Sequence, residues 1–169
     1  MEKTLKAINR MVADGVIEQY SIGRAVAAIY YLEPFDTANL DIFVVLRAAD
    51  EGLMLLTPIY DYLSRQGFST EGELVDLEGL PVQILPVFNP LTEEAVRKAH
   101  QIKFGRTVTR VMRAEHLLAI MLDTGRPKDY ARIAMFLEQK AVNRRALASV
   151  LKRHGLARKW EENQHRFHP

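Results

Sequence analysis

The sequence predicts an α+β fold, in which a small mixed β-sheet is flanked by helices and followed by a C-terminal helical part. Three observations predict it. The chain of 169 residues is long enough to bury a core as one domain. Residues 40–46 are continuously apolar after their aspartate, as in a buried strand. Helical and extended patterns alternate up to about residue 111, and from residue 113 onward the pattern is helical.

The first elements follow from the spacing of apolar residues. Residues 2–14 carry apolar side chains at helical intervals, and Gly15 ends that helix. Residues 20–22 predict a short strand, and the run of small residues at 25–30 predicts a buried helix. The strand at 40–46 is β-branched and aromatic, which favours a central position in the sheet.

The middle of the chain predicts a helix, a hairpin and a second helix. Thr57 as N-cap, followed by a proline, begins a helix that ends at Gly67. Residues 68–77 and 80–87 are predicted to pair as an antiparallel hairpin through a Glu-Gly turn. Asn89, again followed by a proline, begins the next helix.

The last third is predicted to be one extended segment followed by helices. Residues 102–111 predict the extended segment. The helices that follow are separated by Gly125 and Asn143 and end near Gly155. The polar tail from Trp160 is expected to fray. We therefore divide the chain into an α/β core at residues 1–97 and, at residues 98–169, an extended strand with a basic helical part packed on that core.

Composition excludes several function classes. The chain has no cysteine, which excludes a disulfide framework, a thiolate zinc site and cysteine catalysis, and a reducing cytoplasm fits this composition. No apolar run is long enough to cross a bilayer, so we expect no membrane partner. The charges are unevenly distributed: residues 1–96 have a balance of −9 (6 Lys/Arg, 15 Asp/Glu) and residues 97–169 one of +11 (17 Lys/Arg, 6 Asp/Glu). Such asymmetry points to a polyanionic partner.

Residues at the start of the predicted central strand could hold a metal–phosphate complex. Asn39 and Asp41 are two residues apart, so on a strand their side chains share a face. Oxygen ligands in this arrangement suit Mg²⁺, which also takes ligands from substrate phosphates. Gly23 precedes a predicted helix, where backbone N–H groups can approach a phosphate closely. An ordinary turn glycine and a solvated aspartate are the alternative interpretations.

The order of these motifs resembles a known family. Gly-x-Ala-x-Ala-x-x-Tyr from Gly23, then Glu-Pro, then Thr-x-x-Leu-Asp-Ile-Phe-Val at 37–44 are similar to nucleotidyltransferase-fold proteins of the DNA polymerase β superfamily. The most similar branch is the bacterial one that includes abortive-infection-type toxins, and the sequence leaves open whether the chain belongs to a toxin–antitoxin pair. The resemblance extends through Pro-Val-Gln-Ile-Leu-Pro at 81–86 and Ala-Glu-His-Leu-Leu-Ala-Ile at 114–120 to Thr-Gly-Arg-Pro-Lys-Asp at 124–129. It covers roughly residues 18–155.

The resemblance implies a reaction and a set of roles. The family transfers a nucleoside monophosphate from an NTP to a hydroxyl group on a protein, an RNA or a small molecule, with Mg²⁺ held by three acids. It implies that Asp41 is catalytic, that Asp41 and Asn39 bind metal, and that Gln83 occupies the third-acid position. Gly23 and Arg24 would hold the nucleotide phosphates.

The C-terminal part supplies further candidates for the nucleotide. By the same resemblance, Arg126 and Lys128 would contact the triphosphate, and Asp129 would orient one of them or cap its helix. The basic helices beyond residue 143 could bind an RNA or a protein, although a solvated helix face explains their charge equally simply.

Departures from the family pattern bear on catalysis. Arg24 replaces the second glycine of the motif, Asn39 replaces the first acid, and Gln83 replaces the third. Amides offer neutral oxygens and lack the charge that holds Mg²⁺. The alternative function is therefore a catalytically degenerate nucleotidyltransferase fold that binds a nucleotide, an RNA or a protein.

Overall fold

A mixed seven-stranded β-sheet forms the centre of the structure, a computed structural model that describes residues 1–34, 36–46 and 56–167. Its strand order is β3-β4-β5-β2-β1-β7-β6. The strands are β1 (Gln19–Ile22), β2 (Leu40–Val45), β3 (Thr70–Glu71), β4 (Leu74–Asp76), β5 (Pro81–Pro86), β6 (His100–Phe104) and β7 (Thr107–Val111). The predicted α+β class with a small mixed sheet is confirmed.

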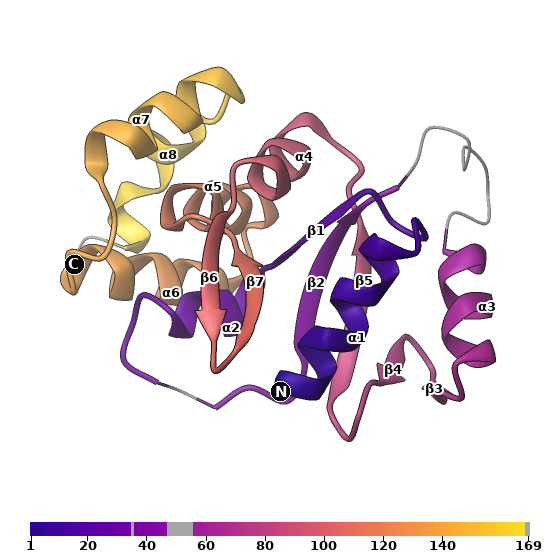
Figure 1. Cartoon of the computed structure of the whole chain (residues 1–169). Coiled ribbons are helices and arrows are strands. Elements are labelled where there is room, and N and C mark those ends of the chain that lie inside the picture. Colours follow the sequence, from indigo (N-terminus) through magenta and orange to yellow (C-terminus); the bar gives the residue numbers. More distant parts are fainter. Residues whose placement is uncertain (35, 47–55, 168–169) are drawn as a thin grey trace.

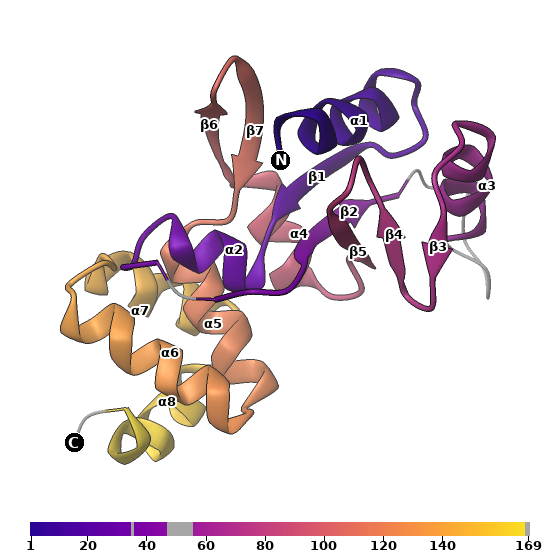
Figure 2. The same cartoon turned by 90° about the horizontal axis from the view of Figure 1, so that it is seen from below.

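Helices flank this sheet on both sides (Figure 1). They are α1 (Glu2–Ala13), α2 (Arg24–Ile29), α3 (Thr57–Arg65), α4 (Pro90–Arg97), α5 (Ala114–Thr124), α6 (Pro127–Glu138), α7 (Arg144–Arg153) and α8 (Ala157–Asn163). Figure 2 shows α1 on one side of the central strands and the C-terminal helices α5 to α8 on the other. None of the helices in the described ranges is both long and apolar enough to cross a membrane.

Strand β2 lies at the centre and is buried along its whole length, as its apolar run predicts. It pairs antiparallel with β1 and parallel with β5. The parallel register places Asp41 beside Gln83. Two residues that are far apart in sequence therefore become neighbours on one face of the sheet.

Short-range signals set most helix ends. The Asn89 side chain accepts a hydrogen bond from the Thr92 N–H at 2.8 Å and begins α4. The Asn143 side chain does the same for α7, with the Ala146 N–H at 3.0 Å. Gly125 ends α5 in the left-handed conformation, which glycine adopts without steric cost. These predicted ends are confirmed.

Two local expectations are wrong, and a third is confirmed over a shorter length. The predicted antiparallel hairpin through the Glu-Gly turn is present between β4 and β5, whereas residues 70–71 form a separate short strand, β3, that pairs with β4. The segment at 102–111 is not one extended strand, because Gly105, at φ +59°, turns the chain into the antiparallel hairpin β6–β7. Thr57 lies inside α3, and Leu56 occupies the N-cap without a side-chain hydrogen bond.

The end of the chain also differs from expectation, because it packs where fraying was predicted. Phe167 is only 2% exposed. Its ring stacks on Tyr130 at a centroid distance of 6.3 Å and contacts Trp160 at 4.6 Å. Two aromatic side chains thus anchor a segment whose surrounding sequence is polar, and aromatic burial outweighs the local polarity.

A charged cluster around Glu94 ties α4 to α5 and α7. The Glu94 carboxylate accepts hydrogen bonds from Lys98 at 3.0 Å and from His154 at 2.8 Å, and it contacts His116 at 3.2 Å and Arg153. These partners hold the pKa of Glu94 well below its usual range, although burial acts in the opposite direction. Burial lowers the pKa of the almost fully buried His116. The cluster lies next to the predicted boundary at residues 97 and 98, which falls between α4 and β6.

Candidate functional site

The three residues expected to hold a metal lie together at one end of β2. Asp41 is the second residue of β2, and its side chain is 6% exposed. The Asn39 amide donates a hydrogen bond to Asp41 Oδ1 at 3.0 Å. Gln83, on β5, is the strand neighbour of Asp41. Strand alternation accounts for the contact between Asn39 and Asp41, and the parallel register of β2 and β5, which the sequence analysis did not predict, adds Gln83. A role of these residues in metal binding stays a prediction.

Arg24 reaches into this group from the first residue of α2. Its Nη1 atom lies 3.6 Å from Asp41 Oδ1 and donates a hydrogen bond to Gln83 Oε1 at 3.2 Å. The Gln83 amide in turn donates to Glu73 Oε2 at 3.0 Å. The Arg24 backbone has a φ of +48°, in the left-handed region that favours glycine. Arg24 thus occupies a glycine-type position and sends a guanidinium to the carboxylate.

These donors do not fit a magnesium ion. Asp41 is the carboxylate at the centre, and the Gln83 oxygen that could ligate an ion already accepts a hydrogen bond from Arg24. Asn39 turns its amide nitrogen, which is no metal ligand, toward Asp41. A fixed positive charge 3.6 Å from Oδ1 repels a divalent cation. Within residues 1–34, 36–46 and 56–167, no three His, Asp or Glu side chains form a group that could hold a metal. Burial raises the pKa of Asp41, and Arg24 acts in the opposite direction.

Gly23 is needed here for close packing. A methyl group on it would lie 2.6 and 2.7 Å from two ring carbons of Phe43 and 3.3 Å from Met112 Sδ. Its N–H donates a hydrogen bond to the Asp41 carbonyl at 3.0 Å. Its φ of −125° is open to other residues. A tight fit against Phe43 therefore accounts for this glycine, and its predicted contact with phosphate stays a prediction.

The C-terminal candidates lie at the start of α6. Arg126 donates to the buried Asp129 carboxylate in a bidentate pair, from Nε at 2.7 Å and from Nη2 at 3.1 Å. The same carboxylate accepts from the Arg126 backbone N–H at 3.3 Å and so closes the helix start. Asp129 is therefore both paired with Arg126 and placed to cap the helix, while contact of Arg126 with a triphosphate stays a prediction. Lys128 is exposed, and its positive charge acts to lower the pKa of Asp41.

Sequence reasoning missed three residues around this group. Arg132 follows Lys128 by one helical turn, and its positive charge also acts to lower the pKa of Asp41. The i, i+4 spacing of these two basic residues was the signal in the sequence that could have indicated Arg132. Phe88 directly precedes the Asn89 cap and is 79% exposed. Glu73 lies in the β3–β4 turn, and its contact with Gln83 depends on how that hairpin folds back. No sequence pattern indicated Glu73.

A small cavity opens among these side chains. Its volume is about 80 Å³, and its lining includes Arg24, Phe43, Phe88, Arg126 and Arg132. Asp41 and Gln83 contact Arg24 but do not line the cavity themselves. Arg24 belongs to the acidic part of the chain, residues 1–96, whereas Arg126 and Arg132 belong to the basic part, residues 97–169. The cavity brings these three side chains together.

Comparisons with known proteins assign no family. No known family model matches the chain, and no curated protein matches it. Among solved structures, one that is similar is the solution structure of the antibiotic-resistance factor ANT(2'')-Ia. The match covers 97% of this chain and 100% of that chain, with 12% sequence identity and a TM-score of 0.45.

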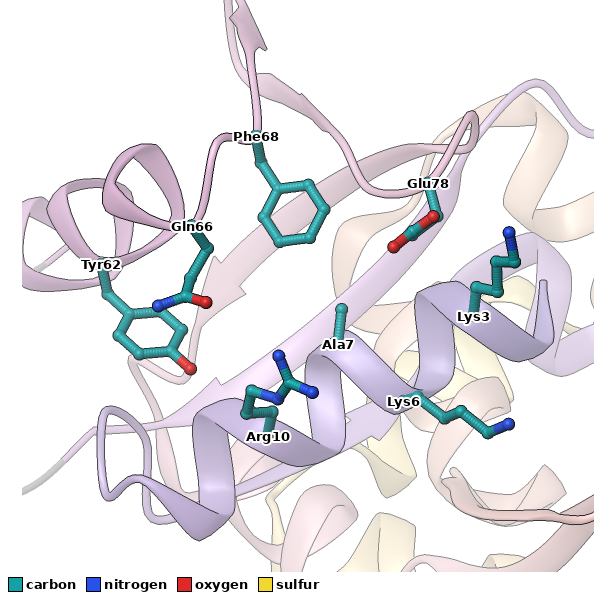
Figure 3. Close-up of a pocket in the computed structure, with 8 residues that line it drawn as sticks. All are labelled: Lys3, Lys6, Ala7, Arg10, Tyr62, Gln66, Phe68 and Glu78. Atoms are coloured by element: carbon teal, nitrogen blue, oxygen red, sulfur yellow. The ribbon is translucent and has the colours of Figure 1, made fainter.

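A second, larger cavity lies away from Asp41. It has a volume of about 430 Å³ and lies between α1 and the segment that contains α3 (Figure 3). Lys3 and Arg10 of α1 face Phe68 and Tyr62 across it. None of its lining residues belongs to the group around Asp41. It is the obvious competing site for an anionic ligand, so any binding experiment needs a variant here.

The basic pairs of the last helices are partly used within the chain. Arg153 binds Glu94, and Arg158 donates to Glu162 at 2.7 Å. Lys159 donates to the Asp123 carbonyl at 2.7 Å. These contacts account for several of the charges that could have faced an RNA or a protein. An RNA or protein partner for these helices stays a prediction.

Proposed function

We propose that this chain is a nucleotide-binding module on a nucleotidyltransferase-like fold, and that it binds the nucleotide's phosphates directly through arginine and lysine. The observation that carries the proposal is the position of Arg24, whose guanidinium contacts Asp41 at 3.6 Å and Gln83 at 3.2 Å. Related enzymes would need a divalent ion beside this carboxylate. Here a permanent positive charge takes that place, and a guanidinium is itself a strong phosphate ligand.

The balance of charge around Arg24 supports the same function. Four cationic side chains belong to the group, namely Arg24, Arg126, Lys128 and Arg132. Three carboxylates oppose them: Asp41, Asp129 and, in contact with Gln83, Glu73. The surplus of one positive charge favours an anionic ligand such as a polyphosphate. Asp129 engages Nε and Nη2 of Arg126, so that Nη1 keeps its N–H donors for a ligand.

The first experiment is a calorimetric titration of the whole chain with ATP, once with excess EDTA and once with Mg²⁺. We expect binding in EDTA to be at least as tight as in Mg²⁺, because the ion neutralises phosphate charge that the arginines would otherwise meet. Binding that requires Mg²⁺ would overturn the proposal. So would release of pyrophosphate with formation of a nucleotidylated product in cell extract.

An Asp41→Asn variant separates the two functions more sharply. In a metal-dependent enzyme, loss of the last central carboxylate abolishes binding of the metal–nucleotide complex. In the proposed module it removes a negative charge that repels phosphate, so ATP should bind about threefold to tenfold more tightly in EDTA, equivalent to ~0.6–1.4 kcal/mol. Asp61→Asn on the exposed face of α3 is the matched control and should change nothing.

The location of binding needs its own control. Arg126→Ala should weaken ATP binding at least tenfold, because it removes a charge-assisted phosphate donor. Arg10→Ala removes a comparable cation from the α1 cavity and should leave the affinity unchanged. If Arg10→Ala weakens binding and Arg126→Ala does not, the nucleotide binds at the other cavity and the proposed site is wrong.

A further inference from the structure

Phe88 is an exposed aromatic ring held in a fixed position. It is 79% exposed, the highest value among the large apolar side chains that the structure describes as exposed. The residues on both sides of it are anchored. The Val87 N–H donates to the Val44 carbonyl at 3.0 Å, and the Asn89 side chain caps α4. The exposure therefore comes with a constrained backbone.

The ring also borders the cavity that the cations line. Arg24, Arg126 and Arg132 share that lining with Phe88. The rest of the lining is mostly apolar and includes Met112, Leu117 and Ile120, together with Asp129, which is paired with Arg126. Because Phe88 shares this lining with the arginines, a nucleotide whose phosphates meet their guanidinium groups lies within reach of the exposed ring.

We infer that Phe88 is the stacking platform for the base, and that the ligand is a purine nucleoside polyphosphate whose phosphates meet Arg24 and Arg126. This inference rests on the proposed function and names its ligand class. Stacking suits an exposed ring because the face of a base covers apolar area that water otherwise contacts. A purine covers more of that face than a pyrimidine.

The test compares ATP with inorganic tripolyphosphate, which carries similar charge and no base. The wild-type chain should bind ATP about fivefold to a hundredfold more tightly than tripolyphosphate. Phe88→Ala should remove that advantage and leave tripolyphosphate binding unchanged. CTP should bind more weakly than ATP to the wild-type chain and equally to the variant.

Two further variants control for structure and for surface chemistry. Phe88→Trp keeps a stacking face, so it should retain the ATP advantage, and its added indole emission should be quenched by ATP and not by tripolyphosphate. Phe104→Ala removes another exposed phenylalanine, on the β6–β7 hairpin, and should bind both ligands as the wild type does. Thermal unfolding of each variant verifies that the fold is intact.

The two proposals fail in different ways. If the wild-type chain binds neither ATP nor tripolyphosphate, the proposed function is wrong and the role of Phe88 falls with it. If tripolyphosphate binds and ATP has no advantage, or if Phe88→Ala leaves that advantage intact, the phosphate site stands and the stacking platform is wrong. Equal losses of ATP and tripolyphosphate binding in Phe88→Ala would also overturn it, because stacking acts on the base alone.

Discussion

Replacement of Gly23 by alanine tests the packing at the base of the candidate site. The added methyl carbon would lie 2.6 and 2.7 Å from two carbons of the Phe43 ring, whereas unstrained carbon contacts are about 3.5–4.0 Å. The ring must therefore move by roughly 1 Å. Phe43 is 4% exposed and Met112 is fully buried behind the same contact, so neither has open space. Overpacking of this kind costs about 1–3 kcal/mol.

The assay is equilibrium unfolding in urea, and the design is a double-mutant cycle. Gly23→Ala should lower the free energy of unfolding by about 2 kcal/mol, and Phe43→Leu alone by about 1 kcal/mol through the space it leaves. Because the smaller side chain makes room for the methyl group, the double variant should recover at least about 1 kcal/mol relative to the sum. A neutral Gly23→Ala, or additive effects, would refute the steric argument.

A second glycine provides the matched control. Gly67 has a φ of +84° and nothing within 4 Å of the position of an added methyl group. Alanine there should cost about 1 kcal/mol through backbone strain alone. Phe43→Leu should leave that cost unchanged, because Phe43 is not a neighbour of Gly67.

The remaining predictions concern stability and ligand binding. Glu94→Gln should lower the free energy of unfolding by about 2 kcal/mol at pH 7.5, because it weakens several charge-assisted hydrogen bonds at once; a loss below about 0.5 kcal/mol in urea unfolding would contradict this. Burial lowers the pKa of His116, so below about pH 6.5 the unfolded chain binds the proton more readily and stability should fall as pH decreases from 8 to 5. A flat profile, or one that His116→Gln leaves unchanged, would argue against that origin. Asn143→Ala should cost about 1 kcal/mol through loss of the α7 cap, measured by the same unfolding, and no change would show that the cap contributes nothing. Arg24→Gly should retain stability or gain about 1 kcal/mol, since it relieves the left-handed backbone, while ATP binding in EDTA weakens at least tenfold; unchanged ATP affinity would separate Arg24 from the phosphate site.

Sequence reasoning succeeded at the site where neighbours are set by local rules. Asn39 and Asp41 share a face because strand side chains alternate, and the structure joins them by a 3.0 Å hydrogen bond. The pairing of Arg126 with Asp129 likewise follows from their spacing at the start of a helix, three residues apart. These contacts span at most three residues, so the chain's own geometry decides them.

Sequence reasoning failed where long-range contacts decide. The fraying predicted at the end of the chain is absent, because Phe167 finds Tyr130 and Trp160. The segment at 102–111 forms part of the antiparallel hairpin β6–β7 and not one extended strand. Strand β7 of this hairpin pairs with β1 and so joins the sheet. In both cases residues outside the segment stabilise it, and the sequence pattern of the segment does not indicate which residues these are.

The sequence by itself determined the α+β class, several helix ends such as those at Asn89, Gly125 and Asn143, and the amides Asn39 and Gln83 where the resembled family would have acids. Only the tertiary structure decided the neighbours of Asp41, since the parallel register of β2 and β5 and the left-handed backbone of Arg24 together bring the Arg24 guanidinium to Asp41 and Gln83. It also decided that cations from the C-terminal part gather near that carboxylate, with Phe88 at the rim. The physical reason is range: periodicity and capping act over a few residues, whereas the charge environment of Asp41 depends on side chains up to about ninety residues away.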